Sequence, residues 1–414
     1  MNRSFKNSFL LTLLFLCLFE QKAKAQYQDY TYIREVETNN SLWNEILLPM
    51  EMFDHLRHDY ADIRLYTITN TDTIEEPYLL EILESKKELK RLNYKIINQV
   101  KDEQSYYYTF ALDSIQNVNE VILNFGVKNF DTRITLYGSD DNSKWYTIKE
   151  NQRILSILNQ EVNYAFTNLT FPTVRYKYLK MEVKGSQDLK LQAPSITYDI
   201  TRLVGLNRCE TESFSIKNDQ RNKKTILTWT TKHLSPVSTI QIKLKDDIDY
   251  IRSIRMYYAT DSTYSSDGMK YHYRELFHGT ISSFEPSIYH FSPTILKHLK
   301  VEIINDDNQA LTIDEIKVQA NSIRLKTRIS NQGHHQLLYG NQLAHFPRYD
   351  IEKFQNKIPK NLTIASLGLE SLNPANIKED SPVIKPVFEN KFWLWGLMGL
   401  IIVLLGWYTL KMLK

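Results

Sequence analysis

Residues 26–385 consist of short runs in which apolar and polar side chains alternate with a period of two. Because successive side chains of a strand point to opposite faces, such runs predict half-buried β-strands. Asn, Asp, Ser and Gly separate the runs, a pattern typical of all-β sandwiches. Helical patterns are few: a short helix is expected within 51–60, and residues 81–92 suit either a helix or a strand pair. Clear strand patterns occupy residues 121–125, 132–137, 178–183 and 225–229.

Three of these strand patterns recur further along the chain at nearly constant spacing. Residues 134–137 resemble 254–257, and residues 178–183 resemble 298–303, each pair 120 residues apart; residues 118–121 resemble 237–240 at a spacing of 119. One spacing for three pairs predicts two copies of a sandwich of about 120 residues. Chance agreement between degenerate strand patterns is the alternative.

The patterns divide the chain into eight segments. We expect two tandem β-sandwiches, flanked by β-rich segments and followed by one C-terminal transmembrane helix. The predicted segments are a signal peptide (1–25), an N-terminal β domain (26–105), a first sandwich (106–200), a second sandwich (201–320), a C-terminal β-rich segment (321–370), a linker (371–391), a transmembrane helix (392–410) and a cytoplasmic tail (411–414).

The first 25 residues have the pattern of a secretory signal. Arg3 and Lys6 precede an apolar run over 10–19, and Ala23-Lys24-Ala25 is a small-x-small cleavage site. The apolar run of about ten residues is too short to cross a bilayer, which takes roughly 20. An uncleaved anchor is the alternative. A lipoprotein is not favoured, because Leu16 precedes Cys17 where a small residue is needed.

The C-terminal run over 392–410 contains no charged residue. Its length is close to the roughly 20 residues of a spanning helix, and no polar face marks it as a core helix. Aromatic residues near both ends and the basic tail predict a single-pass protein with its C-terminus in the cytoplasm. The expected membrane-interface residues are Trp393, Trp395, Trp407, Tyr408, Lys411 and Lys414.

Charge and cysteine content narrow the location and the class of partner. The chain has 51 Lys+Arg and 48 Asp+Glu; without residues 1–25 the two counts are equal at 47. Nucleic-acid binding needs a basic surplus and is not expected. Only Cys209 lies beyond the leader, so no intrachain disulfide is expected in the exported part. A large animal ectodomain usually has several, which favours a bacterial inner-membrane protein with a large periplasmic region.

The first predicted sandwich resembles galactose-binding-like, discoidin-type domains. Residues 136–148 contain Ser139-Asp140-Asp141 followed by a turn and Trp145, and residues 175–183 are similar to a late strand of that fold. The resemblance implies a β-sandwich and does not specify a ligand. In the second copy, Met269 or Tyr271 stands near the position of Trp145.

A second resemblance extends over most of the chain. Residues 43–49, 60–66 (with Asp62-Ile63-Arg64), 76–78, 338–341 and 347–350 resemble an uncharacterised bacterial family with a signal peptide, a β-rich exported region and one C-terminal membrane helix. The resemblance implies topology and an envelope membrane-protein partner.

Two sets of residues are candidates for ligand binding. Ser139, Asp140, Asp141 and Asn142 offer oxygen ligands for calcium, but a hairpin turn is the favoured interpretation, because these residue types form turns. Trp145 and Tyr107 are candidates for stacking on sugar rings. For Trp145, packing in the core is the favoured interpretation. Tyr107 lies within Tyr106-Tyr107-Tyr108 and should face away from its two neighbours.

No common catalytic motif occurs in the sequence, and no cofactor or further metal site is expected. The chain lacks Gly-x-Ser-x-Gly, His-Glu-x-x-His, a phosphate-binding glycine loop and Cys-x-x-Cys. We therefore expect a non-catalytic, membrane-anchored envelope protein that binds or scaffolds an envelope partner. The alternative is a carbohydrate-binding module for glycan or peptidoglycan. A glycan-active hydrolase is a weaker alternative, because no two carboxylates are singled out.

Overall fold

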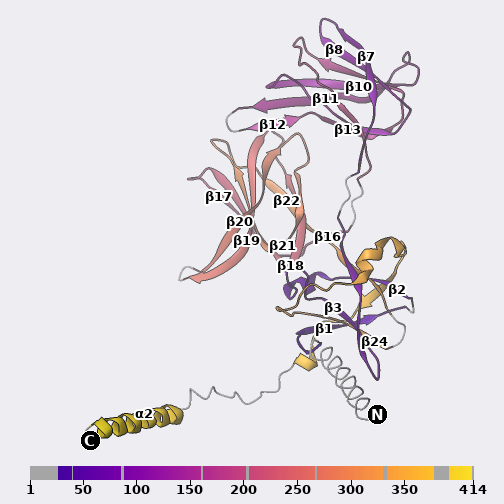
Figure 1. Cartoon of the computed structure of the whole chain (residues 1–414). Helices are drawn as coiled ribbons and strands as arrows, with labels where there is room; N and C mark the ends of the chain where they lie inside the picture. The colour runs from indigo at the N-terminus through magenta and orange to yellow at the C-terminus, as the bar shows by residue number, and fades with distance from the viewer. Residues whose placement is uncertain are drawn as a thin grey trace.

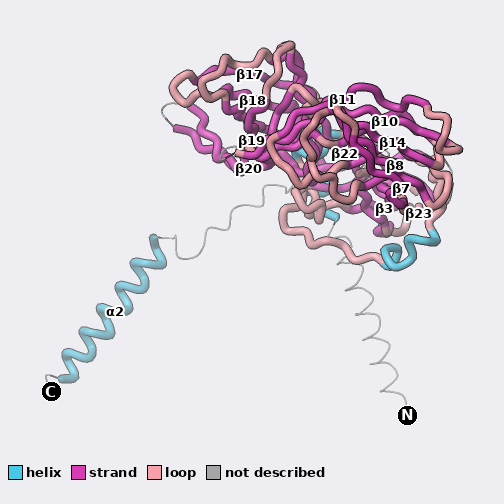
Figure 2. The backbone as a smooth tube through the Cα atoms, turned by 90° about the horizontal axis from the view of Figure 1, so that it is seen from above, coloured by secondary structure: helices cyan, strands magenta, loops and turns pink. Residues whose placement is uncertain are grey.

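Strands dominate the computed structural model of the chain (Figure 2). The structure describes residues 27–39, 41–84, 88–159, 162–201, 205–265, 268–329, 333–376 and 391–412. The all-β prediction is confirmed in this broad form. The predicted signal peptide, most of the linker and Lys414 lie outside the described residues.

The two ends of the folded region form one nine-stranded sheet, which we call the base domain (27–84 and 322–376). Its order is β4-β3-β24-β1-β25-β2-β23-β5, and β26 also pairs with β1. The sequence patterns placed these two segments in separate parts of the chain, 26–105 and 321–370. The strands are β1 (Tyr32–Glu37), β2 (Trp43–Leu47), β3 (Arg64–Ile68), β4 (Thr73–Glu76), β5 (Tyr78–Ile82), β23 (Ile323–Arg328), β24 (His334–Tyr339), β25 (Thr363–Leu367) and β26 (Ser371–Leu372).

The motif residues of the second resemblance lie close together inside the base domain. Asp62 accepts hydrogen bonds from the backbone N–H groups of Gly340 (3.0 Å) and Arg57 (3.1 Å). The guanidinium of Arg64 donates to the carbonyl of His345 at 2.6 Å. Tyr78 donates to the carbonyl of Ile63 at 2.8 Å. The bonds to Gly340 and His345 join the N-terminal half of the domain to the C-terminal half, so the motif has a structural role here.

The first sandwich begins at residue 88 and pairs a six-stranded sheet with a four-stranded sheet. The larger sheet has the order β12-β11-β10-β14-β8-β7, and the smaller β13-β9-β15-β6. Its strands are β6 (Leu89–Arg91), β7 (Tyr94–Lys101), β8 (Ser105–Leu112), β9 (Val118–Ile122), β10 (Phe130–Ser139), β11 (Tyr146–Leu158), β12 (Asn163–Phe166), β13 (Asn168–Val174), β14 (Tyr178–Lys184) and β15 (Ser195–Asp199).

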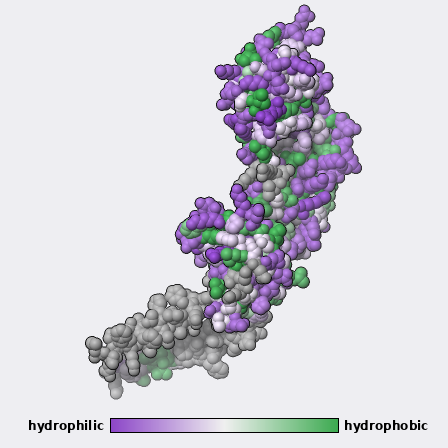
Figure 3. Space-filling model, turned by 90° about the vertical axis from the view of Figure 1, so that its right-hand side faces the viewer, coloured by the Kyte–Doolittle hydropathy of each residue, from purple (hydrophilic) through white to green (hydrophobic). Residues whose placement is uncertain are grey.

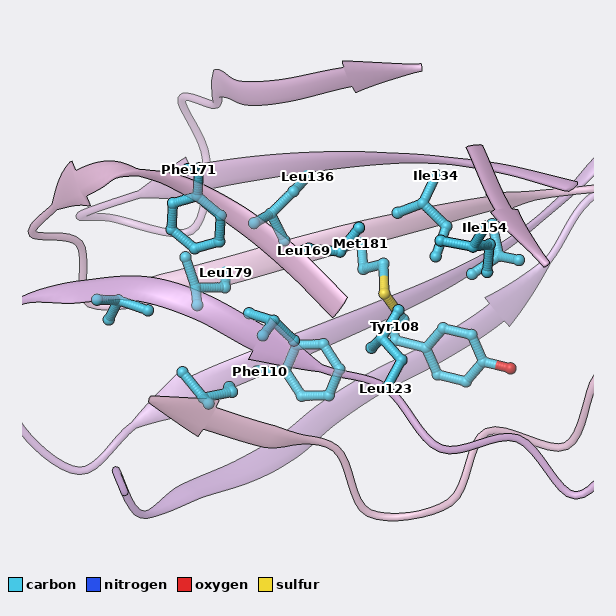
Figure 4. Packing of buried hydrophobic residues seen from close by; sticks show 14 of the residues in the cluster. Tyr108, Phe110, Leu123, Ile134, Leu136, Ile154, Leu169, Phe171, Leu179 and Met181 are labelled. Atoms are coloured by element: carbon cyan, nitrogen blue, oxygen red, sulfur yellow. The ribbon is translucent and has the colours of Figure 1, made fainter. Parts of the chain in front are cut away.

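Alternating side chains of these strands fill the space between the two sheets (Figure 4). Ile134 and Leu136 of β10 and Leu179 and Met181 of β14 are at most 1% exposed. Burial of each such side chain contributes about 1.5–3 kcal/mol. The residues between them along each strand therefore form the outer face of the larger sheet.

The second sandwich is built from a single seven-stranded sheet, β16-β22-β18-β21-β19-β20, with β17 paired to β18. Its core includes Trp229, Ile254, Met256 and Val301. The strands are β16 (Leu206–Arg208), β17 (Thr211–Asp219), β18 (Lys224–Leu244), β19 (Ile251–Ser265), β20 (Gly268–Ser282), β21 (Ile288–Ile304) and β22 (Ile313–Asn321).

The strand pairing of the two sandwiches shows the internal repeat directly. Ile134 pairs with Val183 between β10 and β14, and Ile254 pairs with Ile303 between β19 and β21. Both partners in the second pair lie 120 residues after those in the first. The repeat is therefore structural, with the register of its central strands retained.

The second copy differs because two pairs of strands are fused. β18 takes the places of β8 and β9: Leu227 pairs with Val301, and Ile240 pairs with Val318 of β22. β21 likewise takes the places of β13 and β14. Register shifts near Ser235 mark where β18 passes from one layer to the other. Two separate sheets thus become one continuous sheet.

The second sandwich lies between the base domain and the first sandwich (Figure 1). Arg153 of β11 forms a 2.5 Å ion pair with Asp249, and Tyr164 of β12 is hydrogen-bonded to Ser282 of β20 at 2.7 Å. On the other side, Asp54 of the base domain contacts His233 Nδ1 at 2.6 Å. The coloured residues on the face of the molecule in Figure 3 are mostly hydrophilic, and the hydrophobic residues among them form small, scattered patches.

Within the described residues the helices are short, apart from α2 (Lys391–Met412). The 3-10 helix η1 (Met50–Asp54) overlaps the short helix expected within 51–60, and η2 (Asp350–Lys357) and η3 (Pro374–Asn376) belong to the base domain. Asn373, which was expected in the linker, is only 1% exposed. Its side-chain amide donates a hydrogen bond to the carbonyl of Tyr30 at 2.8 Å, so it belongs to the base domain.

The expected membrane-spanning helix is not confirmed. No helix within the described ranges is both long and apolar enough to cross a membrane. In α2 the side chains are described from Met398 to Lys411, and Trp407 and Tyr408 are exposed. The side chains of Trp393 and Trp395 lie outside the described part.

Candidate functional site

The predicted calcium loop forms a tight turn between β10 and β11. Asp141 Oδ1 accepts hydrogen bonds from the N–H groups of Ser143 and Lys144, both at 2.9 Å, and from Ser139 Oγ at 3.1 Å. These backbone donors, first that of Lys144, hold the pKa of Asp141 well below its usual range. Asn142 has a left-handed backbone with φ 59°, which Asn tolerates better than most residues. Asp140 is exposed.

This geometry uses the acidic oxygen to close the turn. No three His, Cys, Asp or Glu side chains in the described residues lie close enough to hold a metal ion. The turn interpretation accounts for the residue types here.

Trp145 lies on the outer face of the larger sheet, so its predicted place in the core is wrong. The ammonium of Lys180 is 4.4 Å from the ring centroid of Trp145 and 5.0 Å from that of Tyr137. Tyr137 donates a hydrogen bond to Glu182 at 3.0 Å. We call Tyr137, Trp145, Lys180 and Glu182 the first cluster. All four side chains are half-buried, and partial burial lowers the pKa of Lys180.

Tyr107 lies beside the first cluster. It is paired with Glu182 across β8 and β14, and it is half-buried. Tyr108 is in the core, and Tyr106 packs against the core. Partial burial and a hydrogen bond to Asp102 raise the pKa of Tyr107. The structure thus brings Tyr107 and Trp145 to the same face.

The second sandwich repeats this arrangement. The ammonium of Lys300 is 4.5 Å from the ring centroid of Tyr257 and 4.6 Å from that of Tyr273. Glu302 accepts from Lys300 (3.1 Å) and from Lys224 (3.0 Å). We call Tyr257, Tyr273, Lys300 and Glu302 the second cluster. Burial raises the pKa of Glu302, but Lys224 and Lys300 more than offset this and leave it lowered.

The register shows that the two clusters are equivalent. Trp145 lies two residues before the β11 partner of Tyr137, and Tyr273 lies two residues before the β20 partner of Tyr257. The expectation that Met269 or Tyr271 replaces Trp145 is therefore wrong. The second hairpin is eight residues longer, because Tyr257 and its partner are 18 residues apart, against 10 for Tyr137 and its partner.

The aromatic row continues beyond the second cluster. The rings of Tyr271 and Tyr273 are 6.2 Å apart, and the ring of Tyr271 lies 4.3 Å from that of His298. His298 Nδ1 is 3.1 Å from Thr230 Oγ1. Burial, and then the neighbouring charge of Lys297, lower the pKa of His298. The imidazole is therefore neutral near pH 7.

The row enters a cleft of about 620 Å³ between the second sandwich and the base domain. Tyr258, Tyr271 and His298 line it from the sandwich, and His58, Tyr60 and Ile82 line it from the base domain. Clefts of roughly 300–1,000 Å³ between domains are common ligand sites. The sequence patterns did not single out these cleft residues. The 120-residue spacing pointed to Tyr257 and Lys300 as counterparts of Tyr137 and Lys180, but no local pattern pointed to the cleft.

The two clusters present flat rings and charged or hydroxyl groups next to each other. Aromatic faces pack on the C–H surfaces of a ligand, and ammonium, hydroxyl and carboxylate groups hydrogen-bond its polar substituents. The arrangement suits binding of a flat, polyhydroxylated molecule. Within the described residues neither cluster includes Ser, Cys or His as a nucleophile–base pair of the usual kind.

No family model matches the sequence, and no curated protein matches it. The envelope-protein family indicated by the sequence motifs is therefore not confirmed.

Several solved structures are similar to parts of the chain. A glycoside hydrolase 29 family member from an unknown rumen bacterium is 11% identical, with a TM-score of 0.20 over 53% of this chain and 40% of that one. The chain thus spans less than half of that protein. The CBM32-1 and CBM32-2 domains of ZmpB from Clostridium perfringens are 8% identical, with a TM-score of 0.21 over 62% of this chain and 94% of that one.

A fucolectin from the serum of the striped bass, Morone saxatilis, is 9% identical, with a TM-score of 0.18 over 54% of this chain and 84% of that one. At these TM-scores the similarity establishes neither a shared fold over the whole chain nor a shared ligand.

Proposed function

We propose that the chain is a non-catalytic glycan-binding protein that uses the outer faces of its two sandwiches. The observation that supports this is the repetition of the clusters: each copy holds a lysine between two aromatic rings, beside a glutamate, at equivalent register positions. Packing of the cores requires only the inward residues of these strands. Two copies that differ in hairpin length and strand fusion nevertheless keep the same outward group, which indicates a role beyond folding.

The chemistry of the clusters suits sugar rings. Trp145 and Tyr273 offer aromatic surface at the edge of each cluster. Lys180 and Lys300 can donate hydrogen bonds, and the half-buried Glu182 can accept them, so hydroxyl groups of either orientation find a partner on the first cluster.

Affinity electrophoresis of the full chain in gels containing amylose, laminarin, mannan, galactan or pectin tests the proposal. We expect retardation by at least one polysaccharide. Trp145→Ala and Tyr273→Ala should each weaken it about tenfold, and the double variant should weaken it further, because two linked sites act together.

Tyr264→Ala is the matched control. Tyr264 lies on the second sandwich, like Tyr273, is 86% exposed and belongs to neither cluster. Retardation that Trp145→Ala and Tyr273→Ala leave unchanged would place the glycan elsewhere, and absence of retardation by every polysaccharide would count against the function.

A protein partner is the second candidate, and the edge strands favour it. β7 and β17 occupy equivalent sheet edges, and Ile96, Val100 and Ile216 on them are 46–48% exposed. An exposed edge can add a strand from another chain. Crosslinking through a photoreactive residue at position 97 should then capture one consistent protein, and recovery of none would argue against scaffolding.

The exported, membrane-anchored location in the bacterial inner membrane is also part of the proposal. It rests on the sequence patterns over 1–25 and 392–410. A reporter that works only in the cytoplasm should be active when it is fused after Lys414. Release of the chain from membranes by alkaline carbonate would contradict anchoring.

A further inference from the structure

The cleft between the base domain and the second sandwich lies at one end of the aromatic row. Tyr273 of the second cluster neighbours Tyr271, and Tyr271 contacts His298 in the wall of the cleft. A ligand that lies along the outer face of β20 and β21 therefore reaches the cleft without leaving aromatic contacts.

The opposite wall comes from the base domain, through Tyr60 and His58. Tyr60 has a left-handed backbone with φ 58°, which a bulky residue rarely adopts. Its N–H bonds to the carbonyl of Arg57 at 3.0 Å, and its ring packs edge-on against Phe53. Strained residues of this kind are held by their surroundings and concentrate at ligand sites.

Two polar groups in the walls of the cleft are uncharged at neutral pH, Tyr60 and His298. Burial raises the pKa of Tyr60 to about 12, so its hydroxyl remains a hydrogen-bond donor at neutral pH. His298 is neutral there because its pKa is lowered. The charged lining residues are Asp261 and Lys297, of opposite sign, and Lys297 also pairs with Glu212 at 3.5 Å. An uncharged ligand fits this lining best.

We propose that the cleft binds the neutral terminal sugar of a glycan whose following units lie on the second cluster. The proposal rests on the glycan-binding function, and it states which way the bound glycan runs: its end lies in the cleft and its internal units lie on the second cluster. The open outer face of a sheet admits internal units of a polymer, whereas the cleft has a second wall, formed by His58 and Tyr60, where a chain end would be held.

The test compares chain ends with internal units, using the full chain. The probes are the retarding polysaccharide from the gel series and the hexasaccharide prepared from it, which supplies many ends for the same mass. Tyr60→Asn removes the ring while an Asn keeps the left-handed backbone. We expect about tenfold weaker binding of the hexasaccharide in calorimetry, with polysaccharide retardation changed less than twofold.

Tyr264→Asn is the matched control and should change neither measurement. Tyr271→Ala supplies a second variant from the opposite wall, with the same expected loss. Hexasaccharide binding that survives both Tyr60→Asn and Tyr271→Ala, while Trp145→Ala and Tyr273→Ala still weaken retardation, would overturn the cleft and leave the glycan function standing. If no polysaccharide retards the chain, both proposals fail.

Discussion

Individual residues on the outer faces are placed by alternation, but their partners are set by pairing between strands. Lys300 and Glu302 share a face because they are two residues apart on β21, and Lys224 joins them from β18, 78 residues earlier in the chain. Glu302 is 8% exposed, so its charge depends on these two cations. Each cluster therefore links a local pattern with a long-range contact.

Glu302→Gln should make stability less dependent on pH. The pKa of Glu302 is lowered in the folded chain, so its contribution is present above the unfolded value near 4.5 and is lost as the pH falls through the folded value. We expect the variant to be about 2 kcal/mol less stable in urea at pH 7, with a smaller difference at pH 3. Glu315→Gln, at an exposed pair with Arg208, should have little effect at either pH. An equal loss of stability at pH 7 and pH 3 would show that the ion pairs of Glu302 do not contribute to the stability of the folded chain.

At the scale of elements, the strand patterns and the 120-residue spacing allowed the repeat to be predicted, but not the fusion of strands. Between β8 and β9 the chain has Asp113 and Ser114, which favour a break. The corresponding part of β18 also contains turn-favouring residues, Ser235 and Pro236, yet the strand continues there through a register shift instead of ending. The core position predicted for Trp145 was wrong because alternation fixes only which residues share a face. Which of the two faces is covered depends on the second sheet.

The end of β24 requires a glycine for a steric reason. Gly340 has φ +85°, its N–H bonds to Asp62, and an added Cβ would lie 2.7 Å from the ring of Tyr32. Gly340→Ala should lower the free energy of unfolding by roughly 1–3 kcal/mol in urea. Gly368→Ala is the control in the same domain, because its Cβ would make ordinary contacts at 3.5 Å. Equal effects of the two changes would refute the steric explanation.

On the scale of the whole molecule, the two sandwiches are inserted into the base domain, which combines residues 27–84 with residues 322–376. β5 pairs with β23, joining residues about 240 positions apart. Such pairing leaves no local signal in the sequence, so the strand patterns predicted an N-terminal domain and a separate C-terminal segment. The resemblance motifs held the only hint, because Asp62 and Gly340 belong to the same motif set and bond to each other. The base domain also forms one wall of the cleft, through His58, Tyr60 and Ile82.

The inserted architecture predicts which fragments fold alone. Residues 88–201 have their own two sheets and core, so this fragment should unfold cooperatively in urea with a strand-type circular dichroism spectrum. Residues 27–84 supply five strands of the nine in the base sheet, and β1 and β2 pair only with strands from after residue 322. That fragment should be unfolded alone and should gain strand structure when residues 322–376 are added. A folded 27–84 fragment would show that its own strands suffice, and the cleft wall at Tyr60 would then not depend on closure of the base domain by the C-terminal strands.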